Sequence, residues 1–318
     1  MDRSPDQPLD LSSTLLMTLV CAIWGGAFVA IKIGLLDMPP LGSAALRFFL
    51  TAVALLLWAR LQTTSLLYPW PETRVLALLT FLFFAFNLLL YLGTARTASG
   101  RATVFFYSQP VFLAVLAHYF LPNDSLTVRK GCGLIFALGG LVVLFLTKMR
   151  VGHTPTLTGD VLVLSGALAN AIYNVITKRA GNRIHPVAVI LWNSLGAALL
   201  LGICSWGFEH GTSFTFSARA VASLLYLSLI SAAFGFVTFI WLIQHNSAVR
   251  VTALVFLAPV FGVLFAWLLL HETLTGVQLL GVAGVCTGVY MVNSTGAGTG
   301  AGGTDQRSPR RRVTAASR

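Results

Sequence analysis

Long apolar segments alternate with short polar ones along almost the whole chain. Segments of about 20 mainly apolar residues are long enough to cross a bilayer as a helix. They lie at 13–35, 42–60, 74–95, 99–120, 128–147, 159–179, 186–207, 219–243, 249–270 and 275–293. Turn-forming residues interrupt the pattern, for example at Asp37–Pro40 and Leu121–Asp124. The pattern predicts an all-α membrane protein with ten transmembrane helices.

The two halves of the chain repeat one another. Pro-Val-Phe at Pro110 is matched at Pro259, and the residues from Asp124 to Thr127 are matched by those from Glu272 to Thr275. Two glycines in each half also match. These pairs are Gly133 with Gly281 and Gly140 with Gly288. Each copy contains five predicted helices, so the second copy must enter the membrane in the opposite orientation. The repeat therefore predicts two inverted-topology five-helix repeats, as in many transporters.

The repeat also divides the chain into five parts. We expect an N-terminal segment (1–12), a first repeat (13–147), a linker (148–158), a second repeat (159–293) and a basic tail (294–318). The tail is rich in Gly, Ser, Thr and Arg and has little apolar surface to bury. We expect it to be disordered.

Composition and charge favour a membrane protein over a soluble one. Hydrophobic residues make up 56% of the chain and charged residues 10%, whereas a soluble domain is about 25% charged. The net charge of +11 does not indicate a nucleic-acid partner, because the basic residues lie in short loops and in the tail. With both termini in the cytoplasm, 14 Lys and Arg residues face the cytoplasm and 6 face the other side. We therefore expect a multi-pass protein of the plasma (inner) membrane with cytoplasmic termini.

The sequence lacks the residues that several kinds of chemistry require. The four cysteines lie in apolar segments without a CxxC pair, which predicts packing roles and no metal site. No Walker, HExxH or GxSxG sequence occurs, so we expect neither an enzyme nor a bound cofactor. No Asp or Glu lies in the middle third of a predicted helix, which disfavours a proton-coupled cation antiporter.

The sequence Trp24-Gly25-Gly26-Ala27-Phe28, followed by Lys32 and then Arg47, opens the first repeat. Together with the closing pattern of each half, it resembles the EamA branch of the drug/metabolite transporter (DMT) superfamily, over about residues 12–293. The resemblance implies a ten-helix inverted-repeat fold and export or exchange of a small metabolite. It also implies a central cavity lined mainly by the first, third, fourth, sixth, eighth and ninth helices. Two features depart from the family pattern: Asp124 replaces the usual Glu, and the sixth helix carries ANAIYNVITK instead of a Trp-Gly opening.

Polar side chains within the predicted helices are the candidate substrate ligands, because such groups avoid lipid. Asn170, Tyr173 and Asn174 are spaced by three and four residues, so they share one helix face. The predicted substrate-binding residues are Trp24, Asn87, Tyr91, Tyr107, Gln109, Asn170, Tyr173 and Asn174. Hydrogen bonding between helices is the alternative role for these residues.

Other residues in the helices are assigned to the scaffold or left open. Pro110 and Pro259 fall in the middle of predicted helices and serve either as hinges or as packing kinks. Asp124 and Glu272 are expected to cap the helix that follows each of them. Arg47 is expected to reach the headgroups or a helix-end carbonyl, with an anionic substrate as the alternative, and Lys32 and Lys178 are expected to be anchors.

These observations favour a secondary or facilitative transporter that exports a small metabolite, such as an amino acid, by alternating access. A nucleotide-sugar or sugar-phosphate exchanger is an alternative, but it would need several cations in the cavity. An intramembrane enzyme and a receptor are alternatives from other classes. The expected partners are a small-molecule substrate and the lipid bilayer, and both a monomer and a homodimer remain open.

Overall fold

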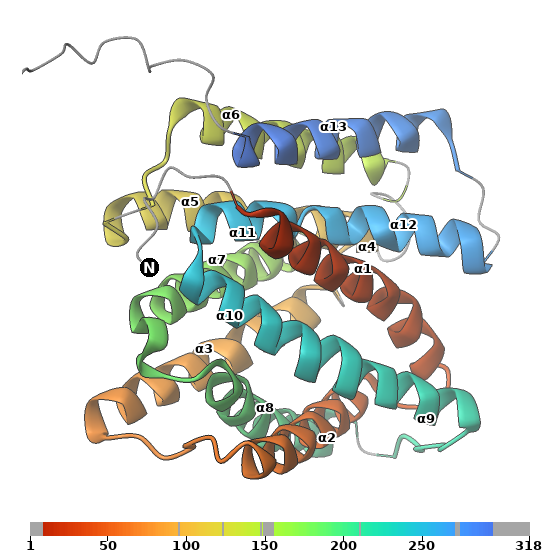
Figure 1. Cartoon of the computed structure of the whole chain (residues 1–318). Helices are drawn as coiled ribbons and strands as arrows, with labels where there is room; N and C mark the ends of the chain where they lie inside the picture. Colours follow the sequence, from red (N-terminus) through yellow and green to blue (C-terminus); the bar gives the residue numbers. More distant parts are fainter. Residues whose placement is uncertain are drawn as a thin grey trace, which may run out of the picture.

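The computed structural model describes residues 9–94, 96–122, 124–146, 148, 156–209, 211–270 and 274–294. Over these ranges the chain is helical and contains no strand (Figure 1). The predicted tail beyond Ser294, the first eight residues, most of the linker and Glu272 lie outside the described residues.

The helices follow the predicted order. The first half contains α1 (Leu11–Gly34), α2 (Pro40–Leu61), α3 (Trp70–Thr94), α4 (Ser99–Phe106), α5 (Gln109–Phe120) and α6 (Val128–Leu144). The second half contains α7 (Leu157–Ala180), the short η2 (Gly181–Arg183), α8 (Pro186–Phe208), α9 (Ala218–Leu225), the π-helix η3 (Tyr226–Phe236), α10 (Val237–His245), α11 (Ala248–Leu254), α12 (Leu257–Leu270) and α13 (Gly276–Asn293).

These elements form ten segments of about membrane length, which confirms the predicted fold class. In the described ranges, nine segments have at least 18 residues and are apolar enough to cross a membrane. Among them, α4 and α5 form one segment, α9, η3 and α10 another, and α11 and α12 a third. The tenth segment, α6, has 17 residues and therefore reaches about 25 Å.

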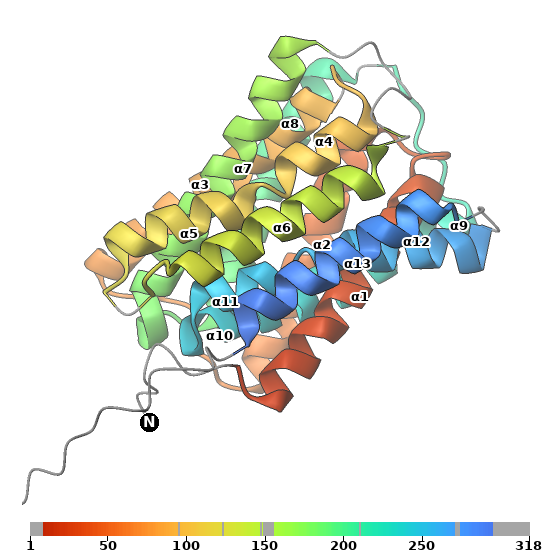
Figure 2. The same ribbon diagram turned by 90° about the horizontal axis from the view of Figure 1, so that it is seen from above.

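The contacts between helices follow the internal repeat of the sequence. The last helices of the two halves, α6 and α13, pack on each other, as do the equivalent pair α2 and α8. In the same way α3 packs on α7, while α9, η3 and α10 pack on α1. Figure 1 and Figure 2 show α6 and α13 side by side at one face of the bundle. Each contact between the halves thus has a counterpart, as two inverted repeats require.

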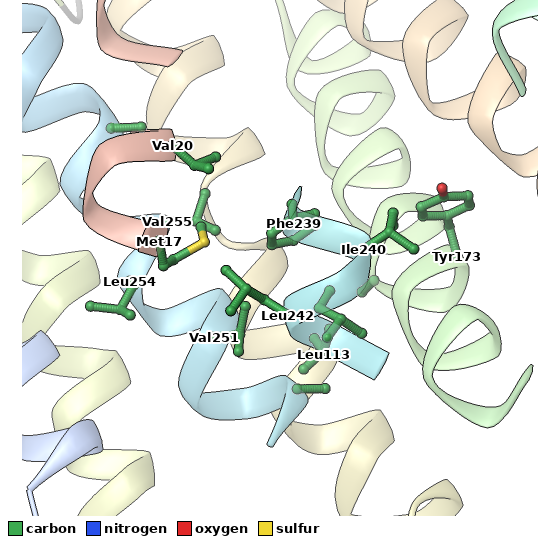
Figure 3. Packing of buried hydrophobic residues seen from close by; sticks show 14 of the residues in the cluster. Met17, Val20, Leu113, Tyr173, Phe239, Ile240, Leu242, Val251, Leu254 and Val255 are labelled. Carbon is green, nitrogen blue, oxygen red and sulfur yellow. The ribbon is translucent and has the colours of Figure 1, made fainter. Parts of the chain in front are cut away.

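The core is built from both halves. Figure 3 shows labelled side chains from α1, α5, α7, α10, α11 and the residue that follows α11 in one cluster of buried apolar residues. They are Met17, Val20, Leu113, Tyr173, Phe239, Ile240, Leu242, Val251, Leu254 and Val255. Neither half can bury these faces alone, so the repeats form one folded unit.

Both prolines of the repeated Pro-Val-Phe sequence lie just after a break in a helix. The chain leaves the helix at Tyr107 and Ser108, and Pro110 is the second residue of α5. The equivalent break lies between Leu254 and Leu257, and Pro259 is the third residue of α12. Proline is well tolerated in the first turn of a helix because the N–H groups there have no intrahelical partner. Each proline thus lies beside an interruption of its segment, and its role as a hinge or as a packing kink stays a prediction.

The threonine that follows each acidic residue is the cap of the next helix. Thr127 accepts a hydrogen bond from the N–H of Lys130 at the start of α6, and Thr275 accepts one from the N–H of Gln278 at the start of α13. Asp124 does not cap α6 as expected. Its carboxylate instead accepts hydrogen bonds at the N-terminus of α11, in the other half of the molecule.

Further polar contacts join the two halves at the ends of the helices. The carboxylate of Glu209 accepts hydrogen bonds from the backbone N–H groups of Leu41 at 2.8 Å and Gly42 at 2.9 Å, at the N-terminus of α2. Asp160 pairs with Arg101 of α4. Within the second half, Lys178 donates to carbonyl oxygens at the C-terminal end of α10, so it is an anchor that binds protein rather than headgroups.

The loop residue Asp37 of the first half forms another polar contact between the halves, with Arg219 of α9. Two guanidinium nitrogens lie 2.7 Å from its carboxylate oxygens, and Ser217 donates a third hydrogen bond. The hydrogen bonds from Arg219 and Ser217 lower the pKa of Asp37 to about 2. The carboxylate therefore stays ionised over the physiological pH range.

This lowered pKa predicts how the contact responds to pH. The pKa of Asp37 is lower in the folded protein than in the unfolded chain, so its contribution to stability is complete above about pH 4 and is lost as the pH falls towards about 2. Melting temperatures of the wild-type protein and Asp37→Asn should differ by a constant amount from about pH 7 to about pH 5 and converge only below about pH 4. Convergence already near pH 5 would contradict a strong contact with Arg219.

Candidate substrate-binding site

Seven aromatic rings meet between the two halves of the molecule. We call them the central aromatic cluster: Trp24, Phe48, Phe83, Phe86, Phe106, Tyr173 and Phe236. Phe83 lies at its centre, with ring centroids 5.3 Å from Phe48, 5.1 Å from Phe86, 6.0 Å from Tyr173 and 6.0 Å from Phe236. Several pairs adopt the edge-to-face geometry that aromatic rings favour. The cluster draws on α1, α2, α3, α4, α7 and η3, which include most of the segments expected to line a cavity.

Trp24 joins the cluster to the π-helix. Its ring centroid lies 5.4 Å from that of Phe236, and its indole N–H donates to the carbonyl of Ser231 at 3.2 Å. The hydroxyl of Thr51 on α2 donates to a second η3 carbonyl, that of Ser228, at 3.2 Å. Backbone groups of η3 thus bind side chains of the first half. Departures from α-helical bonding of this kind often mark functional sites.

Tyr173 contributes its ring to the cluster and its hydroxyl to a buried hydrogen-bond network. The hydroxyl accepts from the amide of Asn193 at 2.8 Å, and the amide oxygen of Asn193 accepts from Thr80 at 3.3 Å. The network connects α7, α8 and α3. Tyr173 is therefore a fixed wall of the site, with its polar group already bound.

Two of the predicted ligands are buried amides that keep an unused polar atom. Asn174 is 1% exposed and donates to Asn170 at 2.7 Å, but its Oδ1 is buried without a partner in the described part of the protein. Gln109 is 6% exposed, and its Nε2 is also buried without a partner there. Buried polar groups are almost always hydrogen-bonded, and each one left unpaired costs ~1–3 kcal/mol. One acceptor and one donor are thus available for a ligand.

The remaining predicted ligands lie in different places in the structure. Tyr107 is buried with its ring centroid 5.9 Å from that of Phe106, beside the cluster. The amide of Asn87 donates to the carbonyl of Phe83 in its own helix at 2.7 Å. Tyr91 lines a small cavity with Arg47 near the C-terminal end of α1.

Within the described ranges Arg47 binds no helix-end carbonyl, so of its two expected scaffold roles contact with the headgroups stays a prediction. Its guanidinium carbon lies 5.0 Å from the ring centroid of Phe48 and 6.0 Å from that of Phe236. Its Nε is buried and unpaired, and within the described ranges its guanidinium makes no hydrogen bond or ion pair. The side chain thus connects the cavity to the central aromatic cluster.

The phenylalanines of the cluster could not be identified from the sequence. Phe83 and Phe86 look like any other residues of an apolar helix, and the chain contains 22 phenylalanines. Their spacing of three residues places them on one face, but it does not show whether that face meets lipid or protein. The role of Asn193 had a clearer signal, because an amide in the middle of an apolar segment requires a partner.

Two inverted five-helix repeats that surround buried aromatic rings and unpaired polar atoms define a membrane transporter. The chain belongs to the EamA-like transporter family, whose model matches residues 11–146 and 157–294.

Relatives and a solved structure agree with this assignment. The chain is 32% identical over 273 residues to an uncharacterized transporter, YoaV, of Bacillus subtilis, covering 86% of this chain and 93% of that protein. It is 30% identical over 287 residues to a protein of Escherichia coli named "Probable amino-acid metabolite efflux pump", covering 87% and 93%. A crystal structure with 19% identity and a TM-score of 0.78 covers 88% of this chain and 96% of that chain, which shows the shared fold.

Proposed function

We propose that this transporter exports a small metabolite such as an amino acid, by a secondary or facilitative mechanism with alternating access. The observation that carries the proposal is the pair of unpaired polar atoms, Gln109 Nε2 and Asn174 Oδ1, in two helices that pack on each other. The name of the Escherichia coli relative, an amino-acid metabolite efflux pump, supports the same substrate class.

The chemistry of these groups suits a zwitterion with an apolar or amphipathic side chain. An amide oxygen such as that of Asn174 accepts from an ammonium group, and an amide N–H such as that of Gln109 donates to an oxygen of the substrate. The central aromatic cluster supplies the apolar wall. We retain all eight predicted ligands, Trp24, Asn87, Tyr91, Tyr107, Gln109, Asn170, Tyr173 and Asn174, as the proposed substrate-binding residues.

Movement would occur between the halves. The breaks before Pro110 and Pro259 interrupt equivalent segments, and we propose them as the hinges. We further propose a plasma (inner) membrane location, cytoplasmic termini and the domain limits given by the repeat, with neither enzymatic activity nor a nucleic-acid partner. A sugar-phosphate exchanger is less well supported, because Lys178 and Arg101 are bound to protein groups and only Arg47, among the described cations, contacts the cluster.

Efflux from proteoliposomes tests this function. Vesicles with the full chain, loaded in turn with each labelled amino acid, should release at least one faster than protein-free vesicles do. Gln109→Leu and Asn174→Leu should each slow that release by about tenfold or more, because each removes one substrate hydrogen bond. Gln109→Leu should not lower the melting temperature, since it also removes an unpaired buried polar atom, whereas Asn174→Leu also loses its hydrogen bond to Asn170 and should lower the melting temperature by no more than about 3 °C.

Thr287→Val is the matched control, since Thr287 lies on the exposed face of α13 and its hydroxyl donates to the carbonyl of Ala283. It should leave release unchanged. Release of no amino acid by the wild-type protein, or wild-type rates in both variants, would refute the proposal.

A further inference from the structure

A small cavity near the C-terminal end of α1 has two hydrogen-bond donors and no protein acceptor for them. We call it the Arg47 cavity; it has a volume of about 30 Å³ and is lined by residues of α1, α2, α3, η3 and α9. Its polar lining residues are Ser43, Arg47, Tyr91 and Ser223. The two serines already donate their hydroxyl protons to the carbonyls of Pro40 and Ala30. The phenol of Tyr91 and the guanidinium of Arg47 make no hydrogen bond within the described ranges.

The protein supplies no counter-charge to Arg47 among the residues described. Each carboxylate that faces the interior is bound elsewhere: Asp37 to Arg219, Asp124 to α11, Asp160 to Arg101 and Glu209 to α2. Two aromatic rings beside the guanidinium offset part of the cost of its burial. A charge at membrane depth without a partner is nevertheless unfavourable, so such residues usually serve a substrate or an ion.

We propose that the Arg47 cavity binds the carboxylate group of a small monocarboxylic substrate, with Arg47 and Tyr91 as its donors. A guanidinium can donate two parallel hydrogen bonds to a carboxylate, and the phenol provides a third donor. A volume of about 30 Å³ has room for one such group or a water or two, but not for a whole metabolite. The rest of the substrate would extend towards the central aromatic cluster, which the Arg47 side chain contacts.

The same geometry disfavours phosphate. A dianion would require more than one cation. The single charge of a carboxylate matches the single charge of Arg47.

This inference rests on the proposed export of amino acids but is tested separately, by anion-dependent stability of the full chain in detergent. Sodium acetate and glycine should raise the melting temperature by about 3 °C at ten times their Kd, whereas acetamide at the same concentration and ionic strength should not. Arg47→Gln should weaken acetate binding by about tenfold to a hundredfold, because it removes hydrogen bonds to a charged group. Arg74→Gln is the matched control, since Arg74 also stacks on an aromatic ring, at 4.8 Å from Trp70, but lies away from the cavity.

Without added anion, Arg47→Gln should melt at the wild-type temperature or above it, since it removes a charge that lacks a partner. A lower melting temperature with an unchanged acetate effect would mean a structural role and overturn the proposal. Equal stabilisation by chloride or phosphate, or no stabilisation by acetate, would overturn it too.

Efflux separates this result from the proposed function. If acetate acts through Arg47 but no amino acid is released from wild-type vesicles, the carboxylate site stands and the proposed function fails. If amino acids are released and Arg47→Gln matches the wild type in both release and acetate binding, the function stands and the site assignment fails.

Discussion

Gly140→Val should separate α6 from α13 and lower the stability of the whole protein. A Cβ atom at Gly140 would lie 2.7 Å from the carbonyl carbon of Gly284 and 2.9 Å from the oxygen of Gly281, and closer still to the nitrogen of Val285. These are all backbone atoms of α13, so no side chain can rotate away to make room. We expect a loss of about 3 kcal/mol, at the upper end of the usual cost of overpacking. For a chain of this size that is a fall in melting temperature of about 6–10 °C.

Gly139→Val is the matched control, because a Cβ atom at Gly139 meets nothing within 4 Å. Both changes replace glycine with the same β-branched residue in the same helix, so they share any effect on helix propensity. The melting temperature of Gly139→Val should stay within about 2 °C of the wild type. Equal destabilisation by the two changes would show that the close approach of α6 and α13 is not what Gly140 provides.

The matched glycines explain why this part of the fold could be predicted from the sequence. Gly133 and Gly140 face Gly288 and Gly281, so the two pairs found by aligning the halves cross over in space. An antiparallel pair of equivalent helices meets in this way when one copy is inverted. Helix number, order and inversion thus follow from apolar length and internal repetition, which are properties of the sequence alone.

The candidate site was predicted less completely than the fold, because it depends on which side chains of different helices come into contact. Asn174 and Gln109 were among the predicted ligands because amides are rare within apolar segments. The rings of Phe83 and Phe236 carry no such signal, since a phenylalanine suits lipid and protein equally well. The partner of Asp124 was also hidden, because its contact with α11 joins residues more than 120 positions apart.

The two halves differ at one matched position in the second helix of each half. Arg47 and Asn193 occupy matched positions, but Asn193 is bound to Tyr173 and Thr80, whereas among the described residues the guanidinium of Arg47 makes cation–π contacts and no hydrogen bond. The second half therefore uses this position to hold the helices together. In the first half no such partner binds Arg47 among the described residues, so the proposed substrate role of Arg47 would be specific to one copy of the repeat.

Asp124→Ala should produce the other large effect, by releasing the N-terminus of α11. The carboxylate of Asp124 is 2% exposed and accepts from the Ser247 hydroxyl at 2.6 Å and from the Val249 N–H at 3.1 Å. It also lies 3.8 Å from the ammonium of Lys130, whose side chain is 5% exposed. Removing one partner of a buried ion pair costs ~3–5 kcal/mol, because the other charge stays buried. The melting temperature should therefore fall by about 6 °C or more.

Asp124→Asn separates the charge from the hydrogen bonds. An asparagine can still accept one hydrogen bond, from Ser247 or from Val249, but it cannot accept both through two oxygens. Its melting temperature should lie between those of Asp124→Ala and the wild type. Glu72→Ala, which removes a carboxylate from the first turn of α3, controls for the loss of one negative charge and should cost less than about 1 kcal/mol.

The Asp124 variants should slow transport in proportion to how far they release the N-terminus of α11. Because α11 precedes the break before Pro259, a loose N-terminus would leave one side of the proposed hinge without a fixed point. Amino-acid release by Asp124→Ala, measured below its melting temperature and corrected for folded protein, should fall more than that by Asp124→Asn. If both variants lose stability but release substrate at the wild-type rate, Asp124 holds the fold and takes no part in the movement between the halves.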